Sequence, residues 1–290
     1  MTATTTAPGL PKAHQTADIK RAPTSVLYVG PPKSGKTTCA LSWPRPLVID
    51  FGSNLSGLSG SVENIPYLLS KYLGSTSEAV INTLTMRLLP ALQAGRIHEI
   101  AEPEQPVETI VFEDLTYLLG EHLDRMVRGA KEALSGFDDY GTFLHRAENI
   151  IVQMTDLTRA GFHVVATIHL GEEGGKDIME RDNRGRWQKV GSTPTKRRPI
   201  VPGKFREIIS GKFENVLLTQ RHMSKRVQPN AQGVAEAVDV AEYYVYTINP
   251  DSTYEGIGEG FGRPGGRYKP LPSKLDGRYP SLARAWGILE

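Results

Sequence analysis

The residues best suited to chemistry lie in one octapeptide, GPPKSGKT, at positions 30–37. It matches the pattern G-x-x-x-x-G-K-S/T, in which glycines let the backbone turn tightly and aim successive N–H groups at an anion. Lys36 can reach the terminal phosphate oxygens of a nucleoside triphosphate, and the Thr37 hydroxyl can ligate Mg²⁺. The octapeptide therefore predicts a phosphate-binding loop.

The alternative interpretation of this octapeptide is a Gly- and Lys-rich turn that arises by chance. Its context favours the loop, because a short apolar segment, Ser25–Val29, precedes it and a short helical segment, Lys36–Trp43, follows it. The positive end of that helix would add to the attraction for phosphate. The expected nucleotide contacts are Gly30, Pro31, Pro32, Lys33, Ser34, Gly35, Lys36, Thr37 and Thr38.

Two acids, Glu113 and Asp114, follow the apolar segment Thr109–Phe112, which is predicted to be a buried strand. Acids at the carboxyl end of such a strand lie in the crevice where open α/β sheets bind ligands. One of the two should hold Mg²⁺ and the other should polarise the attacking water, and the sequence does not decide which. The alternative for each is a solvated loop acid.

Two further polar residues end predicted strands. Asp50 ends the strand in LVIDF, residues 47–51, and is either a nucleotide contact or a turn acid. His169 ends HVVATIH, residues 163–169, where it could contact the terminal phosphate and relay its presence to the following segment. A structural histidine is the competing interpretation. The candidate catalytic residues are therefore Lys36, Glu113, Asp114 and His169.

The elements that must position these residues alternate along the chain. Strand-like apolar runs are separated by stretches with helical spacing, at Ser77–Ala94, where Pro90 predicts a kink, and at Thr142–Ala160. Strands that are nearly continuous in Val, Ile and Leu predict an α/β fold with a mostly parallel central sheet and helices on both faces. Two later strands are expected in an antiparallel C-terminal extension, at residues 215–219 and 243–248.

The predicted organisation has three parts. Residues 1–22 are rich in Thr, Ala and Pro and are expected to be a flexible tail, with a transit peptide as the weaker alternative. Residues 23–250 form the core, in which residues 171–199 are expected to be a mobile loop because they lack an apolar period. Residues 251–290 form an extension rich in Gly, Pro and Arg.

Composition excludes several classes of protein. The 290 residues carry 34 Lys and Arg against 32 Asp and Glu, so bulk charge does not indicate a nucleic-acid binder. No stretch approaches the roughly 18 apolar residues of a membrane helix, and the N-terminus lacks the apolar region of a secretory signal. Cys39 is the one cysteine, which excludes an intrachain disulfide and fits a reducing cytoplasm.

Positive charge is nevertheless concentrated in residues 196–228, where Lys and Arg far outnumber Glu. Such a cluster is typical of contact with a phosphate backbone, and Trp187 before it could stack on an unpaired base. A solvated basic face is the alternative. The candidate DNA contacts are Arg186, Trp187, Lys196, Arg197, Arg198, Lys204 and Arg206. The candidates for reaching a neighbouring subunit's terminal phosphate are Arg263, Arg267 and Lys269.

The ordered set GPPKSGKT, LVIDF, TIVFEDLTYL, VVATIHL and PGKFREIISGKFENVLLT resembles the phage-encoded RecA-like nucleotide-binding proteins, over roughly residues 24–250. The resemblance implies a RecA-like core that uses ATP with Mg²⁺ and binds single-stranded DNA during recombination or annealing. It also implies assembly into a homo-oligomeric ring or filament in the infected bacterial cell, with no membrane partner. A single-strand binding protein is a further partner that it suggests. The absence of an Asn-Lys-x-Asp element favours ATP over GTP.

The resemblance assigns the phosphate loop residue by residue, to Gly30, Gly35, Lys36 and Thr37. Glu113 falls where the family usually has the strand-end Asp, and Asp114 falls where a small hydroxyl residue is common. RecA-type proteins often carry an acid at the position of Gly52. The catalytic base would then be Glu113 or Asp114, or hydrolysis would be weak.

Two other functions fit the phosphate loop. A small-molecule P-loop kinase would use residues 171–199 as a lid, although such a kinase has little need of the basic cluster. A non-catalytic module would bind ATP only to stabilise an assembly.

Overall fold

A nine-stranded sheet organises the chain in the computed structural model. The structure describes residues 23–52, 55, 65–100, 106–129, 131–174, 177–181, 185–192, 196–229, 235–247 and 272–289. Along the sheet the strands follow the order β11-β10-β9-β1-β5-β4-β2-β3, with β8 paired to β5 outside this path. The parallel strands are β1 (Ser25–Gly30), β2 (Pro46–Asp50), β3 (Tyr67–Leu69), β4 (Thr109–Glu113), β5 (His163–Glu173) and β9 (Asn215–Pro229).

The predicted fold class is confirmed. The six strands above run parallel, and β10 (Ala235–Tyr246) and β11 (Lys274–Asp276) add the antiparallel extension. Strand β5 lies between β1 and β4, with Gly30 beside His169 and Phe112 beside Ala166. The carboxyl ends of the three strands therefore meet at one edge of the sheet, which brings the phosphate loop, His169 and the two acids together.

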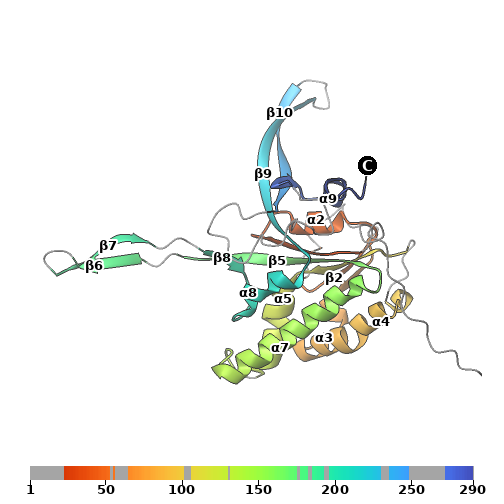
Figure 1. The fold of residues 1–290 in the computed structure, drawn as a ribbon, viewed down its shortest axis with the longest axis horizontal. Helices are drawn as coiled ribbons and strands as arrows, with labels where there is room; N and C mark the ends of the chain where they lie inside the picture. The colour runs from red at the N-terminus through yellow and green to blue at the C-terminus, as the bar shows by residue number, and fades with distance from the viewer. Residues whose placement is uncertain are drawn as a thin grey trace, which may run out of the picture.

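Helices cover both faces of this sheet (Figure 1). One face packs against α2 (Lys36–Leu41) and α9 (Tyr279–Trp286), and the other packs against the remaining larger helices. A hydrophobic core lies on each face of the sheet, and alternate residues of β1 pack into the two cores. Val26 and Tyr28 belong to the core on the α2 side, and Leu27 and Val29 belong to the core on the other side. The helical elements of the second face are α3 (Ser77–Thr83), η3 (Leu84–Leu88), α4 (Leu89–Gln93), α5 (Leu115–Tyr117), η5 (Leu118–Leu123), α6 (Asp124–Arg128), α7 (Gly136–Thr155), η6 (Asp156–Thr158), α8 (Phe205–Ile208) and η7 (Ile209–Lys212). Two short 3₁₀ turns, η2 (Ser70–Tyr72) and η4 (Ile97–Glu99), complete the described helices.

The two longer predicted helices are present, but their bounds or regularity differ from the prediction. The segment predicted at 77–94 is interrupted by the π-helical turn η3, directly before Pro90. Pro90 has no N–H to donate, so the backbone hydrogen bonding changes there. Helix α7 begins six residues earlier than the predicted start at Thr142. Its first turn is largely exposed, Phe137 included, so these residues do not belong to the buried apolar stripe from which the helix was predicted.

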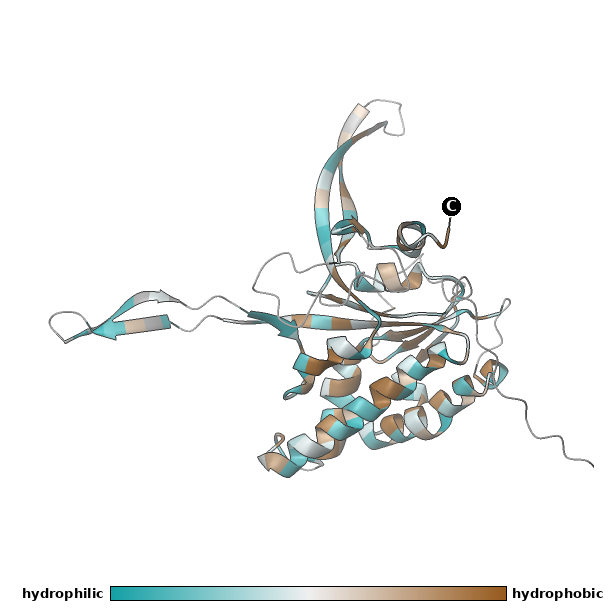
Figure 2. Cartoon of the chain, in the orientation of Figure 1, coloured by the Kyte–Doolittle hydropathy of each residue, from teal (hydrophilic) through white to brown (hydrophobic). Residues whose placement is uncertain are grey.

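The segment predicted as a mobile loop contains strands instead. Strand β5 continues to Glu173 and pairs with β8 (Lys196–Pro199). Beyond that pair, β6 (Asp177–Arg181) and β7 (Trp187–Ser192) form an antiparallel hairpin that projects from the body (Figure 1). Figure 2 shows few strongly hydrophobic residues on this arm. Because the arm covers no core, its strands lack the apolar pattern from which the other strands were predicted.

A second projection is formed by the outer parts of β9 and β10 (Figure 1). The sequence predicts only their inner ends, which carry most of the apolar residues. Its expectation that residues 215–219 are antiparallel is wrong, because β9 pairs parallel to β1 and only β10 runs antiparallel to it. The outer residues pair with one another, from Gln220 opposite Tyr244 to Pro229 opposite Ala235. The tail 1–22 and the candidates Arg263, Arg267 and Lys269 lie outside the described residues. Among the described helices, none has both the length and the apolar character needed to cross a bilayer.

The C-terminal helix is packed against the strand and helix that flank the phosphate loop. Trp43 donates a hydrogen bond from Nε1 to the Tyr28 hydroxyl, at 3.1 Å, and that hydroxyl donates to the Gly277 carbonyl, at 2.9 Å. The Trp43 ring lies 4.8 Å from the Tyr279 ring and 6.2 Å from the Trp286 ring. This cluster ties Tyr28 of β1 and Trp43 after α2 to the C-terminal part of the described chain.

Replacing Trp43 with alanine should lower the free energy of unfolding by about 3–5 kcal/mol, because a side chain that is 2% exposed leaves a cavity. The same substitution at Trp187, which is 62% exposed, should change it by less than about 1 kcal/mol. Urea denaturation followed by circular dichroism measures both variants. Equal losses in the two variants would contradict the packing described.

Candidate functional site

The octapeptide forms a tight loop between β1 and α2. Gly35 has φ 95° and caps the helix, and Lys33 at the exposed tip has φ 63°. A Cβ added to Gly35 would lie 2.1 Å from Cδ1 of Tyr243, and one added to Gly30 would lie 2.3 Å from Oγ1 of Thr219. Glycine is therefore required at both places, by close packing against β9 and β10 and, at Gly35, also by the backbone conformation.

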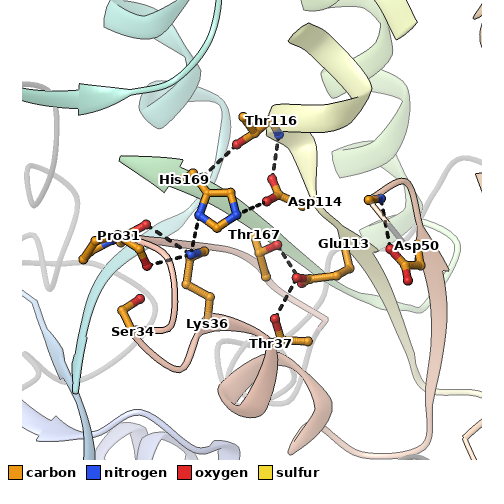
Figure 3. A network of polar contacts seen from close by, with 12 residues as sticks. Pro31, Ser34, Lys36, Thr37, Asp50, Glu113, Asp114, Thr116, Thr167 and His169 are labelled. Carbon is orange, nitrogen blue, oxygen red and sulfur yellow. Dashed lines mark hydrogen bonds and ion pairs between the residues drawn. The ribbon is translucent and has the colours of Figure 1, made fainter. Parts of the chain in front are cut away.

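Lys36 reaches into the mouth of this loop (Figure 3). Its Nζ donates to the carbonyl oxygens of Gly30, at 3.1 Å, and Pro31, at 3.0 Å, and it lies 2.9 Å from Nδ1 of His169. Burial lowers the pKa of Lys36 to about 8, and the nearby carboxylates of Asp114 and Glu113 offset part of that effect. The ammonium group is thus positioned where an anion held by the loop would meet it.

Glu113 faces the first turn of α2. The Thr37 hydroxyl donates to its Oε1, at 2.7 Å, and the Thr167 hydroxyl donates to its Oε2, at 2.6 Å (Figure 3). Burial raises the pKa of Glu113 to about 7, with a further contribution from Asp114. A hydroxyl and a carboxylate side by side are hard oxygen donors of the kind that Mg²⁺ binds together with phosphate. The residues at this point therefore fit the ion that the octapeptide implies.

Asp114 turns away from Thr37 and faces His169. Its Oδ2 lies 2.7 Å from Nε2 of His169, and its Oδ1 accepts from the Thr116 backbone N–H, at 2.7 Å, which caps α5. Because Lys36 is a donor, Nδ1 of His169 acts as the acceptor of that hydrogen bond, and Nε2 is the ring nitrogen that faces Asp114. The structure therefore separates two acids that the sequence left interchangeable.

Asp50 has the arrangement of the turn acid that the sequence offered as one of two interpretations. Its Oδ1 accepts from the Gly52 N–H, at 3.0 Å, and its Oδ2 accepts from the Leu55 N–H, at 3.2 Å. In Figure 3 it lies apart from the contacts of Lys36. Both oxygens therefore support the backbone that follows β2.

Four residues near the loop were not singled out from the sequence. Thr167 contacts Glu113, and Thr116 accepts a hydrogen bond from the His169 backbone N–H. Thr219 shares a hydrogen bond of 2.7 Å with Ser34, and the Tyr243 ring covers Gly35. Thr167 could have been noticed as a polar residue inside an apolar strand. The other three are brought to the loop by strand pairing or helix placement, which leaves no local sequence signal.

A hollow of about 430 Å³ adjoins the outer side of the loop. It is lined by the exposed residues Pro31, Pro32 and Lys33 and by side chains from the neighbouring strands, including Arg197 and Arg221. Arg197 is paired with Glu172, at 2.9 Å. Lys33 and Arg221 have no carboxylate partner among the described residues, so this side of the loop is positively charged.

The candidate DNA contacts fall into two groups. Arg186 and Trp187 lie on the projecting hairpin, where the Arg181 guanidinium stacks 5.0 Å from the Trp187 ring centroid. The second group lies on β8 and around α8, close to the body: Lys196, Arg197, Arg198, Lys204 and Arg206. Arg198 and Arg206 line a hollow of about 590 Å³ together with Tyr117, His169 and Ile200, which we call the His169 hollow.

The raised pKa of Glu113 predicts a pH dependence of stability. The folded protein keeps this proton up to about pH 7, whereas the unfolded chain releases it near pH 4.5. The free energy of unfolding should therefore fall as pH rises through that interval, by on the order of 3 kcal/mol from this group. Denaturant titrations at several pH values should show this fall in the wild type and in Glu78→Gln, an exposed control, and lose it in Glu113→Gln. An unchanged slope in Glu113→Gln would show that Glu113 titrates normally.

Comparison with known families accounts for most of the chain. A family model described as the AAA domain matches residues 22–255, a range that includes β1 to β10 and all the site residues above. No curated protein matches the sequence. The family consists of P-loop ATPases, in agreement with the loop, the buried lysine and the acid at the end of β4. The chain thus belongs to the AAA domain family of nucleotide-binding P-loop ATPases.

Proposed function

We propose that this chain is a Mg²⁺-dependent ATPase that binds single-stranded DNA and acts in phage DNA recombination or annealing. The observation that carries the ATPase part is the buried Lys36 ammonium, with Thr37 and Glu113 joined beside it. The family match supports nucleotide binding and hydrolysis. The DNA part rests on the basic residues of β8 and α8, on the stacked Arg181 and Trp187, and on the resemblance noted in the sequence.

Each residue of the site has a distinct role in this proposal. The loop N–H groups and Lys36 bind the phosphates, replacing the carbonyl partners that Lys36 now has. Thr37 and Glu113 hold Mg²⁺, which when bound supplies charge neutralisation at the phosphates. Asp114 orients the His169 ring, which borders the Lys36 ammonium and so reaches the position of the terminal phosphate. With glycine at position 52, no acid follows Asp50 to serve as base.

The proposal also includes two protein partners, further copies of this chain and a single-strand binding protein. A homo-oligomeric ring or filament would place a neighbouring subunit's basic residues near the ATP, where Arg263, Arg267 and Lys269 are candidates. A single-strand binding protein would supply or protect the same DNA.

A P-loop kinase is the second candidate function. The observation that favours a kinase is the His169 hollow, which lies next to the proposed position of the terminal phosphate and has room for an acceptor molecule. Transfer of labelled phosphate to a panel of nucleosides and nucleotides would reveal it. Tight ATP binding without phosphate release would instead favour a module that only stabilises an assembly.

Replacing Lys36 with alanine should reduce ATP turnover at least about 100-fold, because the ammonium is the proposed phosphate contact. It should leave the circular dichroism spectrum unchanged, because Nζ contacts two loop carbonyls and the His169 ring and not the apolar core. Lys71→Ala, at an exposed position on η2, is the matched control and should turn over ATP like the wild type. Phosphate release is measured for all three proteins with and without a single-stranded oligonucleotide. We expect stimulation by DNA in the wild type and in the control. Absence of ATP turnover in the wild type would overturn the proposed ATPase activity. Equal turnover with and without the oligonucleotide would overturn the proposed stimulation by DNA.

Glu113→Gln and Asp114→Asn should fail in different ways. Glu113→Gln should raise the Mg²⁺ concentration needed for half-maximal turnover at least about tenfold, since it weakens a proposed ligand. Asp114→Asn should keep the Mg²⁺ requirement and lower kcat at least about tenfold, because His169 loses its ionised partner. Titration of Mg²⁺ at saturating ATP separates these effects. The reverse pattern would exchange the roles assigned to the two acids.

A further inference from the structure

The His169 hollow is shaped by three separate parts of the chain. Tyr117 comes from α5, His169 from β5, and Arg198, Ile200 and Arg206 from the segment between β8 and α8. Its volume of about 590 Å³ is within the range of roughly 300–1,000 Å³ that is common for ligand pockets. The hollow therefore has room for a nucleotide-sized group.

The walls of the hollow combine apolar and aromatic surface with guanidinium groups. The Tyr117 side chain is 38% exposed, and Ile200 on the opposite segment is also exposed, so both present apolar surface to solvent beside the hollow. Arg198 and Arg206 are brought next to that surface by β8 and α8. An aromatic ring beside arginines is the combination that binds single-stranded nucleic acid, with stacking on the base and charge on the phosphate.

The two acids that line the hollow are each held in an ion pair. Glu121 and Glu172 line it, but each is paired with a further arginine, Glu121 with Arg125 and Glu172 with Arg197. The lining itself therefore contains two arginines, Arg198 and Arg206, against these two carboxylates. Because both carboxylates are held in ion pairs, neither is an unpaired negative charge that would repel a phosphate.

We propose that the His169 hollow binds one unpaired nucleotide of single-stranded DNA, with its base against Tyr117 and its phosphate near Arg198 and Arg206. This inference rests on the DNA binding proposed above and specifies where one nucleotide of the strand is held. The projecting hairpin with Trp187 is then a separate contact for the strand.

The hollow shares His169 with the nucleotide site. The ring contacts Lys36 and Asp114, and the same residue lines the hollow. The His169 backbone N–H also donates to the hydroxyl of Thr116, a second lining residue, at 2.9 Å. A bound nucleotide would therefore contact residues that are one hydrogen bond away from the phosphate-binding ammonium.

The test measures binding of a fluorescent oligo(dT) by anisotropy to full-length variants. Tyr117→Ala should weaken binding at least about fivefold, as expected for loss of a stacking partner, while Tyr117→Phe should bind like the wild type. Tyr67→Ala is the matched control, because Tyr67 is a comparably exposed tyrosine, at 52%, on strand β3. It should stay within about twofold of the wild type. Thermal unfolding by circular dichroism checks that each variant is folded.

A second pair of variants tests the phosphate contact. Arg198→Gln should weaken binding and reduce the slope of log affinity against log salt by about 0.7, the value for one phosphate of a single strand. Arg159→Gln, whose side chain is 82% exposed after η6, should leave that slope unchanged. Equal slopes for Arg198→Gln and the wild type would overturn the contact.

Photo-crosslinking to the wild-type protein locates the bound oligonucleotide without any substitution. An oligonucleotide containing 4-thiothymidine should crosslink to peptides that include residues 116–121 or 198–206. Crosslinks confined to the hairpin, residues 177–192, would overturn the inference and leave the proposed DNA binding intact. A wild type that binds no oligonucleotide at low salt would instead overturn the proposed function. Binding in the wild type with equal affinities of Tyr117→Ala and Tyr67→Ala would overturn the inference alone.

Discussion

A buried ammonium group needs partners, and the partners of Lys36 determine the arrangement of the site. Two are carbonyl oxygens of its own loop, and the third is the His169 ring at the end of β5. That contact requires β5 to lie beside β1, as the sheet has it. Since β4 lies on the other side of β5, its terminal acids reach the same edge, where Glu113 contacts Thr37 and Asp114 contacts His169. One strand order thus places two contact groups at the same edge, Lys36 with His169 and Asp114, and Thr37 with Glu113.

Much of this could be predicted from the sequence, because the body of the fold depends on local apolar patterns. Strands β1, β2, β4 and β5 were identified from short Val/Ile/Leu runs, and the octapeptide and the acids from residue type and position. The short strand β3 was not predicted, and β9 was expected to be antiparallel. The proximity of Thr37 and Glu113 follows from the rule that strand ends meet at one edge. The separate orientations of Glu113 and Asp114 could not be predicted, since they depend on which side chain Thr37, Thr167 and His169 can reach in three dimensions.

The two projections, in contrast, could not be predicted from the sequence. The β6–β7 hairpin and the outer parts of β9 and β10 are held by strand pairing without a core face, so apolar periodicity does not reveal them. Their positions still matter to the site, because Tyr243 at the inner end of β10 covers Gly35 and Arg221 on β9 borders the loop. Contacts of this kind arise from the pairing of distant segments, and no spacing within the chain encodes them. The site is therefore built from predictable strand ends and from neighbours that only the fold supplies.

The most direct test of this account is a structure of the full chain with Mg²⁺ and a non-hydrolysable ATP analogue. The account predicts that Lys36 leaves the carbonyls of Gly30 and Pro31 for phosphate oxygens, and that the cation lies between Thr37 and Glu113. It also predicts that Asp114 stays with His169. A nucleotide bound away from residues 30–37, or a cation held by Asp114 or Asp50 in place of Glu113, would contradict it.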